Sequence, residues 1–109
     1  MFLNDYATSW SSASDENVKD IIEPITDALE KVSSLRTVIG KYKDEAAGKR
    51  HPFLIAQDVK DVLPEAVSVM NKGLQNECLG LSYTDVIPLL VAAIKELKAE
   101  FDAYKATHP

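Results

Sequence analysis

The strongest constraint on the fold is an apolar repeat near the C-terminal end of the chain. Its members alternate at spacings of three and four residues: Ile87, Leu90, Ile94, Leu97, Phe101 and Tyr104. This is the a/d pattern of a heptad, which places every member on one stripe of an α-helix. We expect a long helix that begins near Ser82 or Thr84 and ends near Ala106. Pro88 is compatible with the first turn of such a helix.

The apolar stripe has two possible uses. It can pack inside its own subunit, or it can join one chain to another, which is the use we expect. About three heptads are marginal as an isolated assembly, so the stripe should add to a wider interface. Glu100 at a g position and Lys105 at the following e position can pair between chains. Isoleucine at a with leucine at d favours two strands in parallel pairs, so the repeat alone does not specify a trimer.

Composition excludes several classes of function. The chain has 109 residues, enough for one domain, and a net charge of −5, which argues against a nucleic-acid partner. No apolar run reaches the ~20 residues of a membrane span, and no secretory signal is visible. The single Cys78 excludes an internal disulfide and is expected to be a small buried residue in a strand. No metal-ligand cluster or phosphate-binding glycine motif is present, so no metal or cofactor is expected.

Two short helices are expected in the first third of the chain. A helical spacing of apolar residues begins near Glu16 and is limited by Pro24, because the residue before a proline disfavours the α conformation. The members of this pattern are Val18, Ile21, Ile22 and Ile25. A second helix is expected from the Thr26–Asp27 cap, with Leu29 and Val32 on its inner face.

The middle of the chain predicts two β-hairpins around a short helix. The first hairpin pairs residues 37–43 with residues 52–56 around a polar tip. A helix of one to two turns opens at Gln57 or Asp58 and is limited by Pro64. The second hairpin pairs residues 67–70 with residues 78–81. The fold class is therefore α-rich α+β, with short N-terminal helices, two β-hairpins and a long C-terminal helix.

The stretch Ser14-Asp15-Glu16-Asn17-Val18-Lys19 carries a possible chemical function. On a continuous helix five steps rotate by about 140°, so Ser14 and Lys19 would diverge. If Ser14 or Asp15 is an N-cap, the chain bends and Lys19 can fold back over the serine hydroxyl. A serine beside a lysine base is a known variant of nucleophilic catalysis. A Ser-Asp pair before a helix is also a common cap without chemistry.

Five segments of the chain, in this order, resemble one known family. They are Ser14-Asp15-x-x-x-Lys19, Ile55-Ala56-Gln57-Asp58-Val59, Leu63-Pro64-Glu65-Ala66-Val67, Tyr83, and Ala93-Ile94-Lys95-Glu96-Leu97. Together they are similar to the C-terminal intramolecular chaperone domain of bacteriophage tail spikes and tail fibres. The same self-cleaving module occurs in some membrane-bound transcription factors. The resemblance covers roughly residues 14–100.

The resemblance implies an assembly and a reaction. Residues 14–109 would form the chaperone domain, and residues 1–13 would be a leader at the end of an upstream fibre. The chain would form a coiled-coil-like homotrimer, with residues 37–56 and 67–82 as hairpin-like projections. In the host cytoplasm this trimer would template folding of the fibre. It would then cut its own Ala13–Ser14 bond, with Ser14 as nucleophile and Lys19 as general base. Whether Lys19 serves its own serine or a neighbour's stays open.

The chemistry sets conditions on the surroundings of Lys19. A lysine must lose its proton to act as a base, and burial favours the neutral form. The neighbouring carboxylates of Asp15, Glu16 and Asp20 would therefore have to face away from the amine. A trimer interface could supply the burial and couple cleavage to assembly. The sequence departs from the family pattern at Asn17, where a basic residue is common, and at Phe53, where a glycine is common.

Two other functions are compatible with the sequence. One is a non-catalytic trimerisation cap of the same fold, in which Ser14 only caps a helix and Lys19 is a solvated charge. The other is a helical adaptor that binds a partner helix along the stripe from Ile87 to Tyr104.

Overall fold

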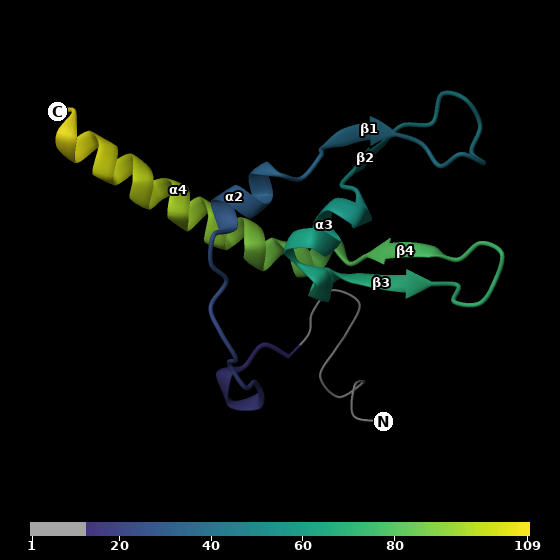
Figure 1. Ribbon diagram of the computed structural model, residues 1–109, viewed down its shortest axis with the longest axis horizontal. Coiled ribbons are helices and arrows are strands. Elements are labelled where there is room, and N and C mark those ends of the chain that lie inside the picture. Colours follow the sequence, from purple (N-terminus) through teal and green to yellow (C-terminus); the bar gives the residue numbers. More distant parts are fainter. Residues whose placement is uncertain (1–12) are drawn as a thin grey trace.

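The core of the protein forms where two of its described helices cross. The structure, a computed structural model, describes residues 13–109 (Figure 1). Helix α4, Ile87–Thr107, packs on helix α2, Ala28–Ser33. Ala28, Leu89 and Ala93 are buried at this crossing. The four-residue spacing of the α4 pair puts both on one face, so this face of α4 is committed to α2.

A second buried cluster lies beside the first. Helix α3, Ala56–Val62, contributes Val59, which packs with Ala66 and Val86. Ala66 ends a 3₁₀ turn, Pro64–Ala66, and Val86 ends a second, Tyr83–Val86, that leads directly into α4. The expected short helix before Pro64 and the long C-terminal helix are thus both confirmed. The α-helical part of the latter begins at Ile87, later than the predicted start near Ser82 or Thr84, because this 3₁₀ turn precedes it.

Two antiparallel hairpins project from the helical core, as predicted. Strands β1, Val38–Gly40, and β2, His51–Phe53, form the first, with Ile39 opposite Pro52. Strands β3, Val67–Met70, and β4, Cys78–Leu81, form the second, with Val69 opposite Leu79. Both hairpins extend toward one end of the long axis, and the C-terminal end of α4 extends toward the other (Figure 1).

Two details of the hairpins correct the sequence interpretation. The first is shorter than expected: β1 spans three residues, and residues 54–55 leave β2 because α3 begins at Ala56. Cys78 lies in β4 as expected but is exposed, not buried. Cys78 is the first residue of β4, next to the loop that joins the two strands, and this end of the hairpin lies away from the core. Its side chain is therefore exposed.

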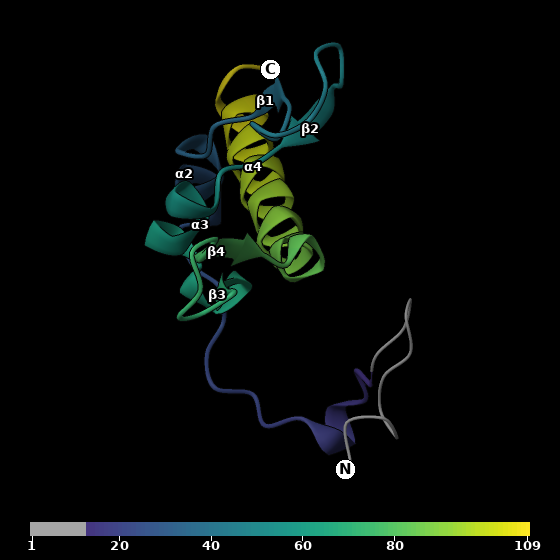
Figure 2. The ribbon, with the colours of Figure 1, turned by 90° about the vertical axis from the view of Figure 1, so that its right-hand side faces the viewer.

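The first predicted helix does not form beyond one turn. A 3₁₀ turn, Glu16–Val18, is followed by residues 19–26, which belong to no helix or strand. Two adjacent β-branched residues, Ile21 and Ile22, and a proline at position 24 oppose helix propagation here. We call residues 14–26 the arm and residues 28–107 the body. Figure 2 shows the arm, in purple and blue, reaching away from the body.

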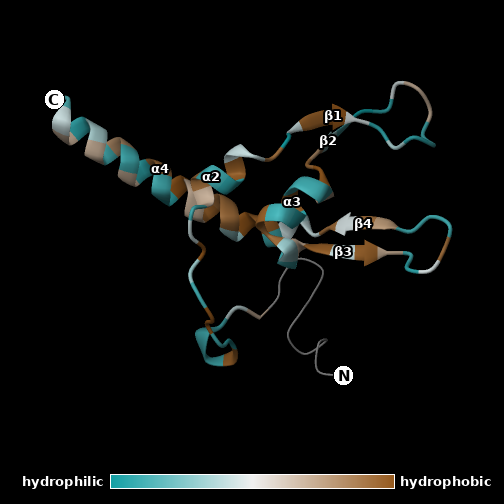
Figure 3. Ribbon diagram, viewed as in Figure 1, coloured by the Kyte–Doolittle hydropathy of each residue, from teal (hydrophilic) through white to brown (hydrophobic). Residues whose placement is uncertain are grey.

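The molecule is open for its size. The radius of gyration of its Cα atoms is 17.9 Å, whereas a compact domain of this length has about 13 Å. Among residues 13–109, the buried hydrophobic core has six members: Ala28, Val59, Ala66, Val86, Leu89 and Ala93. Many apolar side chains of the arm, the hairpins and α4 remain exposed. Figure 3 shows the hydrophobic stretches of these elements in brown along the ribbon.

Candidate functional site

Ser14 and Lys19 meet at the start of the arm. The side-chain nitrogen Nζ of Lys19 donates a hydrogen bond of 2.6 Å to Oγ of Ser14. The proximity expected from the sequence is therefore present, although a continuous helix would separate the two side chains. A hydroxyl and an amine at this distance can exchange a proton, which is the first requirement of a serine–lysine pair.

Local backbone geometry produces this contact. Asp15 is the N-cap of the 3₁₀ turn, and its carboxylate accepts a hydrogen bond of 2.9 Å from the backbone N–H of Asn17. Lys19 closes the turn in an extended conformation, with φ −122° and ψ 141°. The chain therefore bends once and directs the Lys19 side chain back toward Ser14. Of the two caps that the sequence allowed, Asp15 is the one used.

The surroundings of the pair are polar and open. Ser14 and Lys19 are both exposed, and Ala13, on the other side of the predicted scissile bond, is half-buried. Within residues 13–109, no ion pair links Lys19 to Asp15, Glu16 or Asp20. The remainder of the predicted leader, residues 1–12, lies outside the described residues.

The heptad stripe lies on the face of α4 that turns away from α2. Its six members, which are between 41% and 66% exposed, are Ile87, Leu90, Ile94, Leu97, Phe101 and Tyr104. The stripe therefore does not pack inside its own subunit, which was one of its two possible uses. Lys105, which we expected to pair with Glu100 of another chain, lies 3.8 Å from Asp102 in its own helix.

Glu96 is a structural residue that sequence reasoning missed. Its two carboxylate oxygens accept hydrogen bonds of 2.9 Å from the backbone N–H groups of Ala28 and Leu29. These bonds lower the pKa of Glu96, the one from Leu29 having the larger effect. Asp27, the expected cap of α2, adopts φ 52° and makes no capping bond. The true cap comes from 68 residues away, so no local signal could reveal it.

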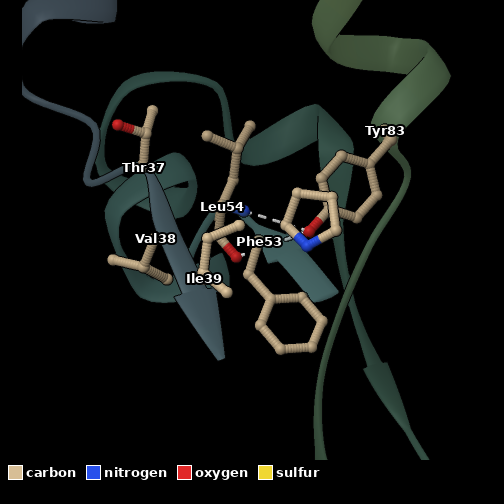
Figure 4. Close-up of a pocket in the computed structure, with 7 residues that line it drawn as sticks. Thr37, Val38, Ile39, Phe53, Leu54 and Tyr83 are labelled. Carbon is tan, nitrogen blue, oxygen red and sulfur yellow. Dashed lines mark hydrogen bonds between the residues drawn. The ribbon is translucent and has the colours of Figure 1, made fainter. Parts of the chain in front are cut away.

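Tyr83 fixes the base of the first hairpin. Its hydroxyl accepts a hydrogen bond of 3.1 Å from the backbone N–H of Leu54. The two residues border an open apolar hollow with Val38, Ile39 and Phe53 (Figure 4). This contact ties the hairpin to the turn that leads into α4.

His51, which the sequence placed in the first hairpin without a function, contacts Glu45 near the tip. The imidazole Nε2 lies 2.9 Å from a carboxylate oxygen of Glu45. Hydrogen bonds from the Tyr42 backbone and, to a smaller extent, from His51 lower the pKa of Glu45. Among residues 13–109, no three side chains of the metal-binding types gather into a site. None of the helices in that range is long and apolar enough to cross a membrane.

A comparison with known protein families identifies the class to which this chain belongs. The family described as chaperone of endosialidase matches residues 14–68, so the match begins at Ser14. The chain belongs to this family, as the resemblance predicted.

Particular relatives are long tail fiber proteins of bacteriophages. The long tail fiber protein Gp37 of Enterobacteria phage K3 is 38% identical over 89 residues, which are 79% of this chain and 7% of the relative. The Gp37 protein of phage T2 matches with the same identity and coverage. That of phage M1 is 37% identical over 82 residues, 72% of this chain and 32% of the relative. This chain thus spans a small part of its relatives.

Proposed function

We propose that this chain is an intramolecular chaperone that assembles as a homotrimer, templates the folding of an upstream phage tail fibre and then releases itself. Membership of the family and the tail-fibre relatives support the chaperone role. The contact between Lys19 and Ser14 is the observation that carries the self-release. Assembly would take place in the host cytoplasm, and the fibre would pass into the virion.

The reaction uses two side chains and water. Neutral Lys19 accepts the hydroxyl proton of Ser14 as Oγ attacks the carbonyl carbon of Ala13. The new C–O bond forms an ester, the Ala13–Ser14 C–N bond breaks, and the freed amine takes the proton from Lys19. Water then hydrolyses the ester and leaves a carboxylate on Ala13. Each step needs only groups that the chain or the solvent supplies.

Assembly would control this chemistry. Lys19 is exposed in the single chain, and burial by a neighbouring subunit would favour its neutral, basic form. The exposed stripe on α4 offers the contact through which subunits would associate. After the cut, the fibre could no longer return through its chaperone and would be held by its unfolding barrier.

Intact-mass spectrometry after incubation at neutral pH tests the cleavage. The wild-type chain should yield a fragment that begins at Ser14, and the Ser14→Ala and Lys19→Met variants should remain whole. Ser12→Ala, a serine two residues upstream, is the matched control and should be cut like the wild type. Cleavage that persists in the Ser14→Ala variant would contradict the proposal.

The dependence on assembly has its own test. Leu90→Glu with Leu97→Glu should give monomers, and these should be cut much more slowly than the wild type. Equal cleavage rates in the two proteins would show that cleavage does not depend on assembly.

A second candidate function is a non-catalytic assembly cap of the same fold. The exposure of both Ser14 and Lys19 in the single chain favours it, because a solvated lysine without a catalytic role needs no burial. A wild-type chain that associates but remains whole in the mass experiment would identify this function. Light scattering that shows a monomer at micromolar concentration would instead favour an adaptor for another protein's helix.

A further inference from the structure

The arm and one flank of α4 are two apolar surfaces that remain uncovered in the same chain. In the arm, Ile21 is 78% exposed and Ile22 is 90% exposed. On α4, Ile87 and Val91 are 54% and 52% exposed. A soluble chain rarely leaves extended apolar segments in water unless a partner covers them.

An open groove of about 410 Å³ lies beside this flank of α4. The root of the arm forms one wall, and the helix forms the other; the lining residues are Pro24, Ile25, Ile87, Pro88, Val91, Ala92 and Lys95. All are apolar except Lys95, and among residues 13–109 Lys95 makes no ion pair. The groove therefore offers an apolar floor with one available positive charge at its edge.

The groove and the heptad stripe share Ile87 but otherwise lie on different flanks of α4. Val91 follows Leu90 by one residue, a rotation of about 100° around the helix axis. Helices that meet along Leu90 and Leu97 would therefore leave the Val91–Lys95 flank open to a different segment.

We propose that Ile21 and Ile22 of a second copy of this chain occupy the groove formed by Pro24–Ile25 and the Ile87–Lys95 segment of α4. The arm carries Asp20 and Glu23 on either side of its two isoleucines, which complements the charge of Lys95. This inference rests on the self-association proposed above and names a second contact within it.

The arm of the same chain is a poor occupant. Its own Pro24 and Ile25 form a wall of the groove, so the chain would have to reverse direction between Ile22 and Pro24. A residue before a proline is restricted to extended conformations, and proline has a fixed φ. Glu23 and Pro24 therefore oppose this reversal. In a closed ring of identical chains, each arm can instead fill the groove of the next subunit.

Disulfide trapping between two differently tagged chains tests the occupant. In a Cys78→Ser background, one chain carries Ile22→Cys and the other Val91→Cys. The two are refolded together and mildly oxidised, and a bond between the chains should form because the Cα atoms would lie within disulfide range. Leu74→Cys, an exposed leucine at the tip of the second hairpin, replaces Ile22→Cys as the control and should form no such bond.

A charge exchange tests the polar part of the contact. Glu23→Lys should lower the trapped fraction several-fold, and adding Lys95→Glu in the same chains should restore it. If neither substitution changes the fraction of chains joined by the disulfide, the proposed charge complementarity is wrong.

The outcomes separate this inference from the proposed function. If light scattering shows association but no bond joins Ile22→Cys to Val91→Cys, the arm contact is wrong and the assembly stands. The same holds if a chain carrying both cysteines closes the bond only within itself. If the chains do not associate at all, the assembly itself fails, and the arm contact fails with it.

Discussion

The arm and the body of this protein are held by different kinds of contact. The six buried hydrophobic side chains of residues 13–109 all lie in the body. Its hydrogen bonds include long-range ones, such as the bond that the Ala28 N–H donates to Glu96. The arm contains no buried residue, and its described hydrogen bonds join residues two to five positions apart. The body is thus held by long-range contacts within one chain. In the part of the chain that the structure describes, the segment that carries Ser14 and Lys19 has no such contacts within its own subunit.

The same contrast divides the two faces of α4. The inner face buries Leu89 and Ala93 against α2, and the outer face leaves the heptad stripe in solvent. One helix therefore belongs to the fold on one side and is available for assembly on the other. In the proposed assembly, the arm and the outer face would both contact a second chain.

The largest predicted effect is a difference in the free energy of unfolding between a substitution in the body and one in the arm. Leu89→Ala removes a fully buried side chain from the body and should lower the free energy of unfolding by about 2–5 kcal/mol. Ile22→Ala, in the arm, should change it by less than about 0.5 kcal/mol. Urea denaturation in the monomeric Leu90→Glu/Leu97→Glu background measures both. Similar losses for the two variants would mean that the arm belongs to the core.

A smaller effect should come from the distant cap of α2. Glu96→Gln replaces one of two accepting oxygens with a donor that faces the N–H groups of α2, so stability should fall. Because folding lowers the pKa of Glu96, its contribution is present above the ordinary carboxyl pKa and is lost as pH falls through the lowered value. Thermal unfolding between pH 7 and about pH 3 should therefore show a weaker acid dependence in the variant.

Glu100→Gln is the control for this experiment, because Glu100 lies on the same helix one turn further on and is exposed. It should behave like the wild type across the pH range. If the thermal stability of the Glu96→Gln variant depends on pH as that of the wild type does, Glu96 does not cap α2.

The smallest effect should be confined to the hairpin base. Tyr83→Phe removes the hydroxyl that accepts from Leu54 and should cost about 0.5–1.5 kcal/mol. Hydrogen exchange at the Leu54 amide should accelerate more than exchange in α2. A uniform acceleration across the body would show that Tyr83 acts on global stability and not on the hairpin.

The sequence predicted those elements whose causes are local or periodic. The second hairpin has the strands expected from alternation at residues 67–70 and 78–81, and the heptad spacing located α4. The contact between Ser14 and Lys19 also followed from a local bend at the Asp15 cap.

The missed features depend on distance or on competition between signals. The cap of α2 comes from Glu96, far along the chain, and Asp27 was chosen because only local caps are visible in a sequence. The apolar spacing of the arm predicted a helix, but Ile21, Ile22 and Pro24 oppose one.

Sedimentation velocity of the wild-type chain beside the Leu90→Glu/Leu97→Glu variant tests the central claim most directly. The wild type should sediment as an oligomer, and the variant should sediment as a monomer with unchanged circular dichroism. Leu74→Glu, an equally drastic change at an exposed leucine of the second hairpin, should remain an oligomer. A wild-type chain that stays monomeric up to high micromolar concentration would contradict the account, because the outer face of α4 would then need no second copy.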